Sequence, residues 1–155
     1  MKNIILYSLL LGSALLFPRQ GTDVGKLLPV ELISIYKEAD TFIIATDAGA
    51  TGTGDTIQNA VMDMKATAEG NVYLDTADFL LISDLSDEEV ETLKGILKPS
   101  IRVCKMEGRV SPQRAADYLR IHRPEQRLGE WARSNPVQLQ IMEGGKLILR
   151  FFEKR

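Results

Sequence analysis

The sequence predicts an α/β (α+β) domain, in which a mixed β-sheet is covered by about three helices and ends in a C-terminal β-hairpin. Three observations support this prediction. Strand-like runs pair at both ends of the chain, helices and strands alternate between them, and residues 79–82 form a continuous apolar run. A run of this length is too short for a buried helix, but it suits a strand covered on both faces. Helix–strand alternation places helices against a sheet.

The composition is that of one ordinary globular domain. The chain has 155 residues, of which 45% are hydrophobic and 26% are charged. We expect a polar linker at 18–26 and a single α/β domain at 27–155. The net charge of −2 gives no argument for nucleic acid as a partner. The sequence also lacks the basic–aromatic interleaving that is typical of single-strand binding.

Residues 1–17 are predicted to be a signal peptide or a short membrane tether. Lys2 precedes an apolar core, and small residues follow up to Ala14, after which cleavage would fit a secretory signal. The apolar stretch of about 14 residues is shorter than the ~20 that a membrane span needs. Both readings place the protein outside the cytoplasm, secreted or tethered to the membrane. The remaining reading is a buried N-terminal strand of a cytosolic protein.

The first part of the domain is predicted to contain a hairpin followed by a glycine-rich loop. Residues 28–36 and 41–46 have the composition of two strands, and the four residues between them suit a turn. Residues 48–54 are expected to form a glycine-rich loop that enters the first helix.

The first helix is predicted from apolar residues that recur from Ile57 to Ala68 with a period of 3.6 residues. Asp55 or Thr56 is expected to cap its N-terminus, where side-chain oxygens accept hydrogen bonds from free backbone N–H groups. Gly70 is expected to end it, because glycine readily adopts the left-handed conformation.

Two more helices are predicted in the second part of the domain. Ser86 and Glu89 form a capping-box pattern at the start of one helix, which Pro99 ends. A strand at 101–106 follows. Pro112 then occupies the favoured first position of a third helix, which is expected to run to about residue 122.

The chain is predicted to finish with a short helical piece and a hairpin. The helical piece at 125–133 contains Trp131, which is expected to be a core residue or an interface anchor. Strands at 137–143 and 146–154 flank two glycines, which suit a type I′ turn because both positions of that turn need positive φ.

Gly49, Gly52 and Gly54 form a weak candidate for an anion-binding loop, because backbone N–H groups before a helix can hold phosphate. The order of these glycines is G-x-x-G-x-G, which differs from the dinucleotide fingerprint, and the Lys-Ser/Thr ending of a P-loop is missing. Asp47 and Asp55 also place negative charge beside the loop. A flexible turn is therefore the main interpretation.

No catalytic, cofactor-binding or metal-binding residue is assigned from the sequence. Cys104 is the only cysteine and lies in an alternating strand, so we expect a small buried hydrophobe. It could act as a nucleophile only if the fold brought it to His122, which is expected to close a helix C-terminus. Asp75, Asp78 and Asp84 flank the buried strand. They are read as solvated strand ends, with acid–base or cation chemistry as the alternative.

Charge is divided unevenly along the chain. Residues 23–91 hold 15 acidic and 3 basic side chains, whereas residues 94–155 hold 14 basic and 6 acidic ones. The simpler interpretation is that the two halves neutralise each other in one fold. The alternative is a basic surface that docks on a partner, built from Arg102, Lys105, Arg109, Arg114, Arg120, Arg123, Arg127 and Arg133.

Residues 27–122 resemble the N-terminal domain of the C-subunit of spore germinant receptors, the Ger(x)C lipoprotein family. The family's G-x-T-x-x-x-A helix start matches residues 54–60, and its G-x-(L/V)-Y-L stretch matches residues 70–74. An apolar strand, a helix, a strand that ends in glycine and a short helix then follow in the family's order. The lipid-anchor cysteine, the Trp-Asp pair after it and the family's later domains have no counterpart in this sequence.

The resemblance implies a non-enzymatic, extracytoplasmic domain with a role in sporulation or germination. Its partner would be a protein at a membrane or spore surface, and the family supplies no catalytic residues or cofactor. The alternative is an enzyme or a small-molecule or phosphate-binding protein that uses the glycine loop 49–54. A third interpretation is an accessory protein whose C-terminal hairpin, with Phe151 and Phe152 on opposite faces, adds a strand to a partner.

Overall fold

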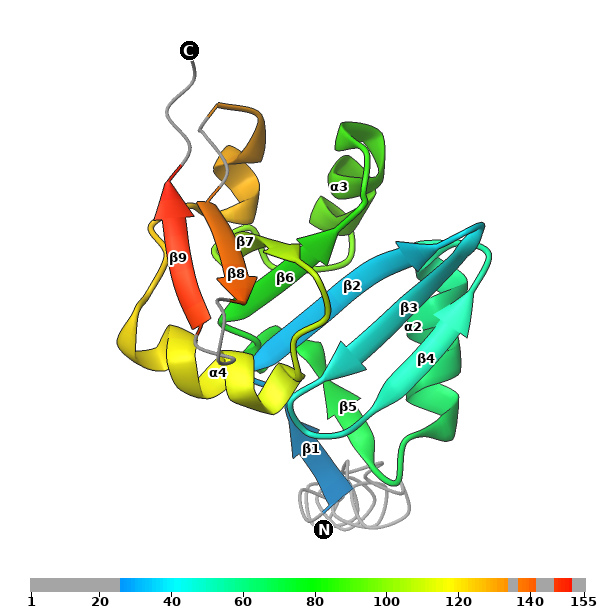
Figure 1. The fold of residues 1–155 in the computed structure, drawn as a ribbon. Helices are drawn as coiled ribbons and strands as arrows, with labels where there is room; N and C mark the ends of the chain where they lie inside the picture. Colours follow the sequence, from blue (N-terminus) through cyan, green and yellow to red (C-terminus); the bar gives the residue numbers. More distant parts are fainter. Residues whose placement is uncertain (1–25, 134–136, 142–146, 152–155) are drawn as a thin grey trace, which may run out of the picture.

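A computed structural model describes residues 26–133, 137–141 and 147–151, and it confirms the predicted α/β class (Figure 1). The predicted segment 1–17 and all but the last residue of the linker lie outside the described residues. The elements, in chain order, are β1 (Leu27–Pro29), β2 (Leu32–Glu38), β3 (Thr41–Thr46), β4 (Thr51–Gly54), α2 (Ile57–Thr67), β5 (Asn71–Tyr73), η2 (Leu74–Thr76), β6 (Phe79–Ser83), α3 (Asp87–Lys94), β7 (Arg102–Glu107), α4 (Pro112–Ile121), η3 (Leu128–Arg133), β8 (Val137–Ile141) and β9 (Leu147–Phe151).

A seven-stranded mixed sheet lies at the centre of the domain, in the order β4-β3-β2-β6-β7-β8-β9. The inner strands β2, β6, β7 and β8 are parallel, while β3, β4 and β9 pair antiparallel with their neighbours. The apolar run 79–82 is fully buried in β6, as predicted. None of the helices in the described ranges has the length and apolar character to cross a membrane.

Side chains alternate between the two faces of the sheet and build two separate cores. One core faces α2, α3 and η3, and the other faces α4 (Figure 1). Because successive residues of a strand point to opposite faces, the two central strands β6 and β7 supply both cores. The α2 and α3 side receives Leu80, Ile82 and Val103; the α4 side receives Phe79, Leu81, Cys104 and Met106.

Residues 51–54 form the edge strand β4, so the prediction of a glycine loop over 48–54 is wrong for this part. Helix α2 packs its backbone directly on this strand. A Cβ atom at Gly52 would lie 2.3 Å from Met64 N and 2.4 Å from Ala60 O, and one at Gly54 would lie 2.5 Å from Ala60 N. Only glycine fits at such distances, so these residues serve the packing of helix against strand.

The predicted start of α2 is confirmed, with Thr56 as the cap, but the predicted role of Gly70 is wrong. The Thr56 hydroxyl accepts a hydrogen bond from Asn59 N at 3.1 Å. The helix ends at an extended Ala68, and Gly70 has no positive φ. Gly70 is needed because a Cβ there would lie 2.7 Å from Lys26 O, where the chain passes beside it.

The predicted strand 28–36 is divided into β1, which pairs with β5, and β2, which enters the main sheet. Pro29 has no N–H to donate to a ladder, which favours a break here. Two side chains bind the backbone N–H groups at this break. Val30 N donates to the Thr76 hydroxyl at 3.0 Å, and the N–H groups of residues 31 and 32 both donate to the Asp47 carboxylate at 3.0 Å.

The later elements follow the predictions. The capping box of Ser86 and Glu89 opens α3, and Pro112 occupies the first turn of α4. His122 caps α4, as its N–H donates to Tyr118 O. The predicted helical piece is the 3-10 helix η3, with Trp131 buried. Strands β8 and β9 pair antiparallel as a hairpin; its turn lies outside the described residues.

Helix side chains satisfy backbone groups at both edges of the main sheet. On β4, Thr53 N donates to the Asp63 carboxylate of α2 at 2.8 Å. On β9, Leu149 N donates to the Tyr118 hydroxyl of α4 at 3.2 Å. Edge groups that are already bonded cannot pair with another strand. This geometry argues against strand addition at these two positions, although Phe152 and the side chain of Phe151 lie outside the described residues.

The contact between β4 and α2 predicts a large cost for Gly52→Ala. Forcing a methyl group into the α2 backbone should lower the free energy of unfolding by about 3 kcal/mol or prevent folding. The matched control is Gly95→Ala, where the new Cβ would meet only Thr92 O at an ordinary 3.5 Å. That variant should change stability by less than about 0.5 kcal/mol. Urea unfolding of both proteins provides the measurement, and equal midpoints would contradict the packing argument.

Candidate functional site

Cys104 is a small buried hydrophobe, as predicted. It is fully buried beneath α4, and burial raises the pKa of its thiol to about 12. His122 lies at the end of α4, where its ring packs against Tyr118 in a tilted arrangement, with centroids 4.5 Å apart. A thiol with this pKa is almost entirely protonated at neutral pH, and only the thiolate is a nucleophile. Cys104 therefore fits packing and not covalent catalysis.

The three glycines of the anion-loop candidate do not share a loop. Gly49 lies in the β3–β4 turn with φ of +86°, whereas Gly52 and Gly54 are packed against α2. The Thr56 hydroxyl already binds a backbone N–H group in the first turn of α2, and the Asp55 carboxylate accepts a hydrogen bond from Asn59 Nδ2 at 2.6 Å. The interpretation of 49–54 as one phosphate-holding loop is therefore wrong on geometry.

The eight basic residues of the docking-surface candidate do not form one surface. Lys105 extends over the Trp131 ring, 5.6 Å from its centroid, on the side of the sheet that carries α3. Arg114, Arg120 and Arg123 belong to or directly follow α4, which covers the opposite side. Alternation along a strand and the placing of helices on both faces separate residues that look clustered in the sequence.

Several of these basic side chains bind groups inside the domain. Arg102 Nη1 donates to Pro124 O at 2.8 Å, and Arg120 Nε donates to the Glu31 carboxylate at 3.0 Å. Arg109 forms an ion pair with Glu38. Arg127 forms an isolated backbone bridge with Arg102. Arg133 ends η3, and its side chain lies outside the described residues.

The flanking acidic residues lie at different ends of the sheet. Asp78 precedes β6 and forms an ion pair with Lys98 at 3.4 Å, and Asp75 lies in η2. Asp84 follows β6 at its other end, so the three carboxylates are not brought together. In the described ranges, no group of three or more His, Cys, Asp or Glu side chains is placed to hold a metal ion.

The most distinctive surface feature is a hollow between the carboxyl ends of β6 and β7. After β6 the chain passes to α3 on one face of the sheet, and after β7 it passes to α4 on the other face. Connections that leave adjacent parallel strands towards opposite faces open a crevice at the strand ends, which is where α/β sheets bind ligands. This crevice has a volume of ≈ 330 Å³.

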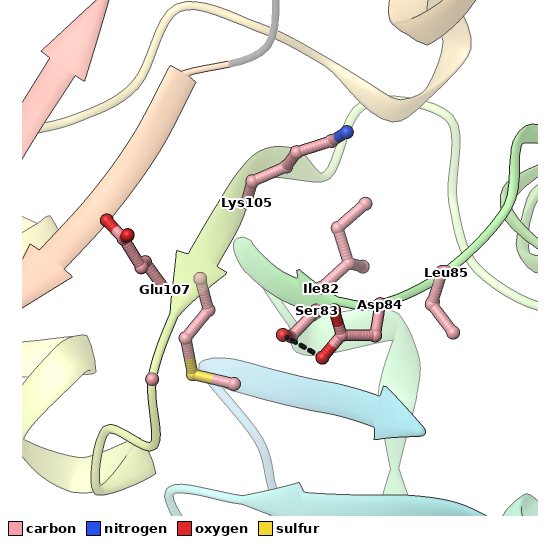
Figure 2. Close-up of a pocket in the computed structure, with 8 residues that line it drawn as sticks. Ile82, Ser83, Asp84, Leu85, Lys105 and Glu107 are labelled. Carbon is pink, nitrogen blue, oxygen red and sulfur yellow. Dashed lines mark hydrogen bonds between the residues drawn. The ribbon is translucent and has the colours of Figure 1, made fainter. Parts of the chain in front are cut away.

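The crevice is lined by the last residues of both strands and the residues that follow them. Each strand is followed directly by a residue with left-handed backbone, Asp84 with φ of 56° after β6 and Gly108 with φ of 76° after β7. The Ser83 hydroxyl donates to the Asp84 carboxylate at 2.9 Å. Figure 2 shows Lys105 extending from β7 on one side and the Asp84 carboxylate beside Ser83 on the other, whereas Glu107 points away from β6.

Charged groups around the crevice differ in whether they are paired. Lys37 and Arg109 line an adjoining hollow that shares Ser83, Asp84, Met106 and Gly108 with the crevice. There Lys37 Nζ binds the Glu89 carboxylate at 3.0 Å, and Arg109 binds Glu38. Within the described part of the chain, Lys105 and Asp84 have no ion-pair partner. Glu107 also lines the crevice and has no ion-pair partner among the described residues, but it points away from β6 (Figure 2). Lys105 and Asp84 are therefore a positive and a negative group on the two sides of the crevice, and the described part of the domain neutralises neither.

Sequence reasoning named Asp84 and Lys105 but did not connect them. It assigned Asp84 to the flanks of a strand and Lys105 to a basic surface, and it did not single out Ser83, Glu107 or Gly108 for this site. The sequence pattern that could have indicated this site was a pair of consecutive strands, each followed by a helix, with polar residues at the carboxyl end of each strand. Which face each helix covers was needed to see the crevice.

A second hollow of ≈ 430 Å³ lies between β1, the β3–β4 turn and the end of α2. Gly49 lines this hollow. Among the described residues that line this hollow, the charged one is Glu69, and its carboxylate would repel an anion. This hollow lacks the opposed charges of the crevice.

No protein-family model, curated protein or solved structure matches the chain. Functional arguments therefore rest on its own residues and geometry, and the resemblance to the germinant-receptor domain remains an expectation from the sequence.

The burial of Cys104 predicts a thiol that does not react in the folded protein. At pH 8, alkylation by iodoacetamide should be at least about 100-fold slower in the native protein than in urea-unfolded protein, because the folded thiol is protonated and covered. Mass spectrometry of the alkylated chain measures this ratio. Rapid alkylation under native conditions would reopen the nucleophile interpretation.

The contacts of the Glu89 carboxylate predict that its contribution to the free energy of unfolding depends on pH. Burial alone would raise its pKa, but hydrogen bonds from Ser86 and the Lys37 ammonium group lower the pKa below the ordinary 4.5. This contribution is present above pH 4.5 and disappears as the pH falls through the lower folded-state pKa.

Glu89→Gln retains a capping-box side chain but loses the charge. Compared with the native protein, this variant should be less stable at pH 7 by about 0.5 kcal/mol and equally stable well below the folded-state pKa. Urea unfolding across this pH range measures the difference. A constant difference at all pH values would contradict the role of the charge.

Proposed function

We propose that this protein is a non-enzymatic, extracytoplasmic protein-interaction domain similar to the N-terminal domain of spore germinant receptor C-subunits, with a role in sporulation or germination. The observation that carries the proposal is the order of elements from β4 to α4. A helix follows Gly54, then come a short strand at 71–73, the apolar strand β6, α3, β7 and α4. The same order defines the resemblance in the sequence.

The chemistry of the described residues also supports a binding role. Burial raises the pKa of the Cys104 thiol to about 12, and the His122 ring packs against Tyr118 at the end of α4. The packing of β4 against α2 removes the glycine loop on which an enzyme or phosphate-binding alternative would depend. A domain that presents surfaces to a protein partner needs none of these groups.

The outer face of α4 is the proposed contact surface. Arg114, Asp117 and Ile121 follow one another at helical spacing on its exposed side, and Ile121 is 78% exposed. Interfaces combine an apolar centre with enriched arginine, and arginine is among the side chains that dominate binding energy, so an exposed isoleucine among arginines fits an interface. The partner would offer an apolar depression bordered by acidic residues, at a membrane or spore surface.

The proposed location and partner are tested with a C-terminally tagged copy in sporulating cells. The expected result is recovery with the membrane or spore fraction, together with membrane or spore-coat proteins. Recovery from the cytosol, alone or with metabolic enzymes, would overturn both the location and the family interpretation.

The contact surface has a test of its own. Ile121→Asp should reduce recovery of the partner at least about tenfold, because it places a charge where an apolar contact is proposed. Met62→Asp is the matched control, since Met62 is 67% exposed on α2, which packs against the other side of the sheet. Loss of the partner with Met62→Asp and not with Ile121→Asp would place the interface elsewhere.

A further inference from the structure

The crevice between β6 and β7 has the features of a binding site for a small ligand. The connections that follow β6 and β7 lead to helices on opposite faces of the sheet. The residues that line the crevice, 82–85 and 105–108, all belong to the two strand ends and the segments after them, and none belongs to a helix. The volume of ≈ 330 Å³ lies at the lower end of the range of about 300–1,000 Å³ that small-molecule sites occupy. The site therefore suits a molecule smaller than a nucleotide.

The two charged walls of the crevice define the ligand's chemistry. Lys105 projects from β7 and lies over the Trp131 ring, which favours a fixed position for its ammonium group. Asp84 projects from the end of β6 and accepts a hydrogen bond from the Ser83 hydroxyl. The surrounding Lys37 and Arg109 are held by other carboxylates. Because the third unpaired lining residue, Glu107, points away from β6 (Figure 2), Lys105 offers a site for an anion and Asp84 a site for a cation.

The backbone at the mouth of the crevice leaves room for such a ligand. A Cβ atom at Gly108 would have no heavy atom within 4 Å, so the space beside this residue is open. Met106 is 5% exposed and contributes an apolar part of the crevice lining. A polar molecule would contact charge at two opposite sides and an apolar surface.

We propose that the crevice binds a small zwitterion, whose anionic group pairs with Lys105 and whose ammonium group pairs with Asp84. Each pair would be a charge-assisted hydrogen bond, and a ligand with both groups gains both bonds in one binding event. This site lies at the carboxyl ends of the strands and involves no residue of the α4 surface, so it extends the proposed function without depending on it.

The probes for this site are ω-amino acids, which place the two charges at different separations. Glycine, β-alanine and 4-aminobutyrate are titrated into the full ¹⁵N-labelled chain, and the amide shifts of residues 82–85 and 105–108 are followed. Butyrate and butylamine are the single-charge controls. We expect saturable shifts with at least one zwitterion, at an affinity at least about tenfold tighter than that of either control. The charge separation in the probe that binds most tightly indicates the distance between the Lys105 ammonium group and the Asp84 carboxylate.

Three substitutions distinguish the proposed contacts from general charge effects. Asp84→Asn removes the carboxylate but tolerates the positive φ, so the backbone of the crevice should persist. Asp84→Asn and Lys105→Gln should each weaken binding about tenfold or more. Glu107→Gln removes a carboxylate from the same rim, but it points away from β6 (Figure 2) and should change affinity by less than about twofold.

The proposal is overturned if none of the zwitterions shifts these amides at about 50 mM, which would exceed a millimolar Kd by a wide margin. It is also overturned if butyrate or butylamine binds as tightly as the best zwitterion, or if Asp84→Asn and Lys105→Gln leave the affinity unchanged. Unaltered amide spectra outside the crevice verify that each variant is folded. None of these results bears on recovery of a protein partner through α4.

Discussion

The direct contact between the backbones of β4 and α2 is the constraint on which the first half of the domain depends. Because Gly52 and Gly54 have no side chains, α2 lies close enough for its apolar stripe to reach the sheet. The same approach brings Asp63 to the N–H of Thr53, so the helix that packs on the strand also bonds its free edge. Any larger residue at position 52 or 54 would displace the helix and undo both effects.

The faces on which the two helices after β6 and β7 pack determine the architecture of the second half of the domain. Each strand supplies both cores, so either face could receive a helix. Helix α3 covers one face and α4 the other, which leaves the carboxyl ends of the two strands open. Among the described residues, Asp84 and Lys105 have no ion-pair partner there, whereas nearby Lys37 and Arg109 are paired with Glu89 and Glu38. Topology, more than any single motif, therefore generates the crevice.

Many of the unevenly distributed charges form ion pairs within the fold. Arg120 binds Glu31, Arg109 binds Glu38, and Lys98 binds Asp78, so basic residues of the second half meet acidic residues of the first. Exposed pairs of this kind contribute little stability individually, typically less than about 1 kcal/mol. Their consequence here is that a basic stretch of sequence does not become a basic surface, and the part that remains available on α4 combines arginine with an exposed isoleucine.

The sequence by itself determined the elements that depend on local chemistry. A continuous apolar run identified β6, apolar periodicity identified α2, the capping box of Ser86 and Glu89 identified α3, and paired strand-like runs identified the final hairpin. Only the tertiary structure decided what depends on distant contacts. The glycines of β4 pack against a helix that lies later in the chain, and Asp47 and Thr76 bind the break before β2 from far away. The crevice likewise required knowing which face each helix covers, because strand alternation permits both.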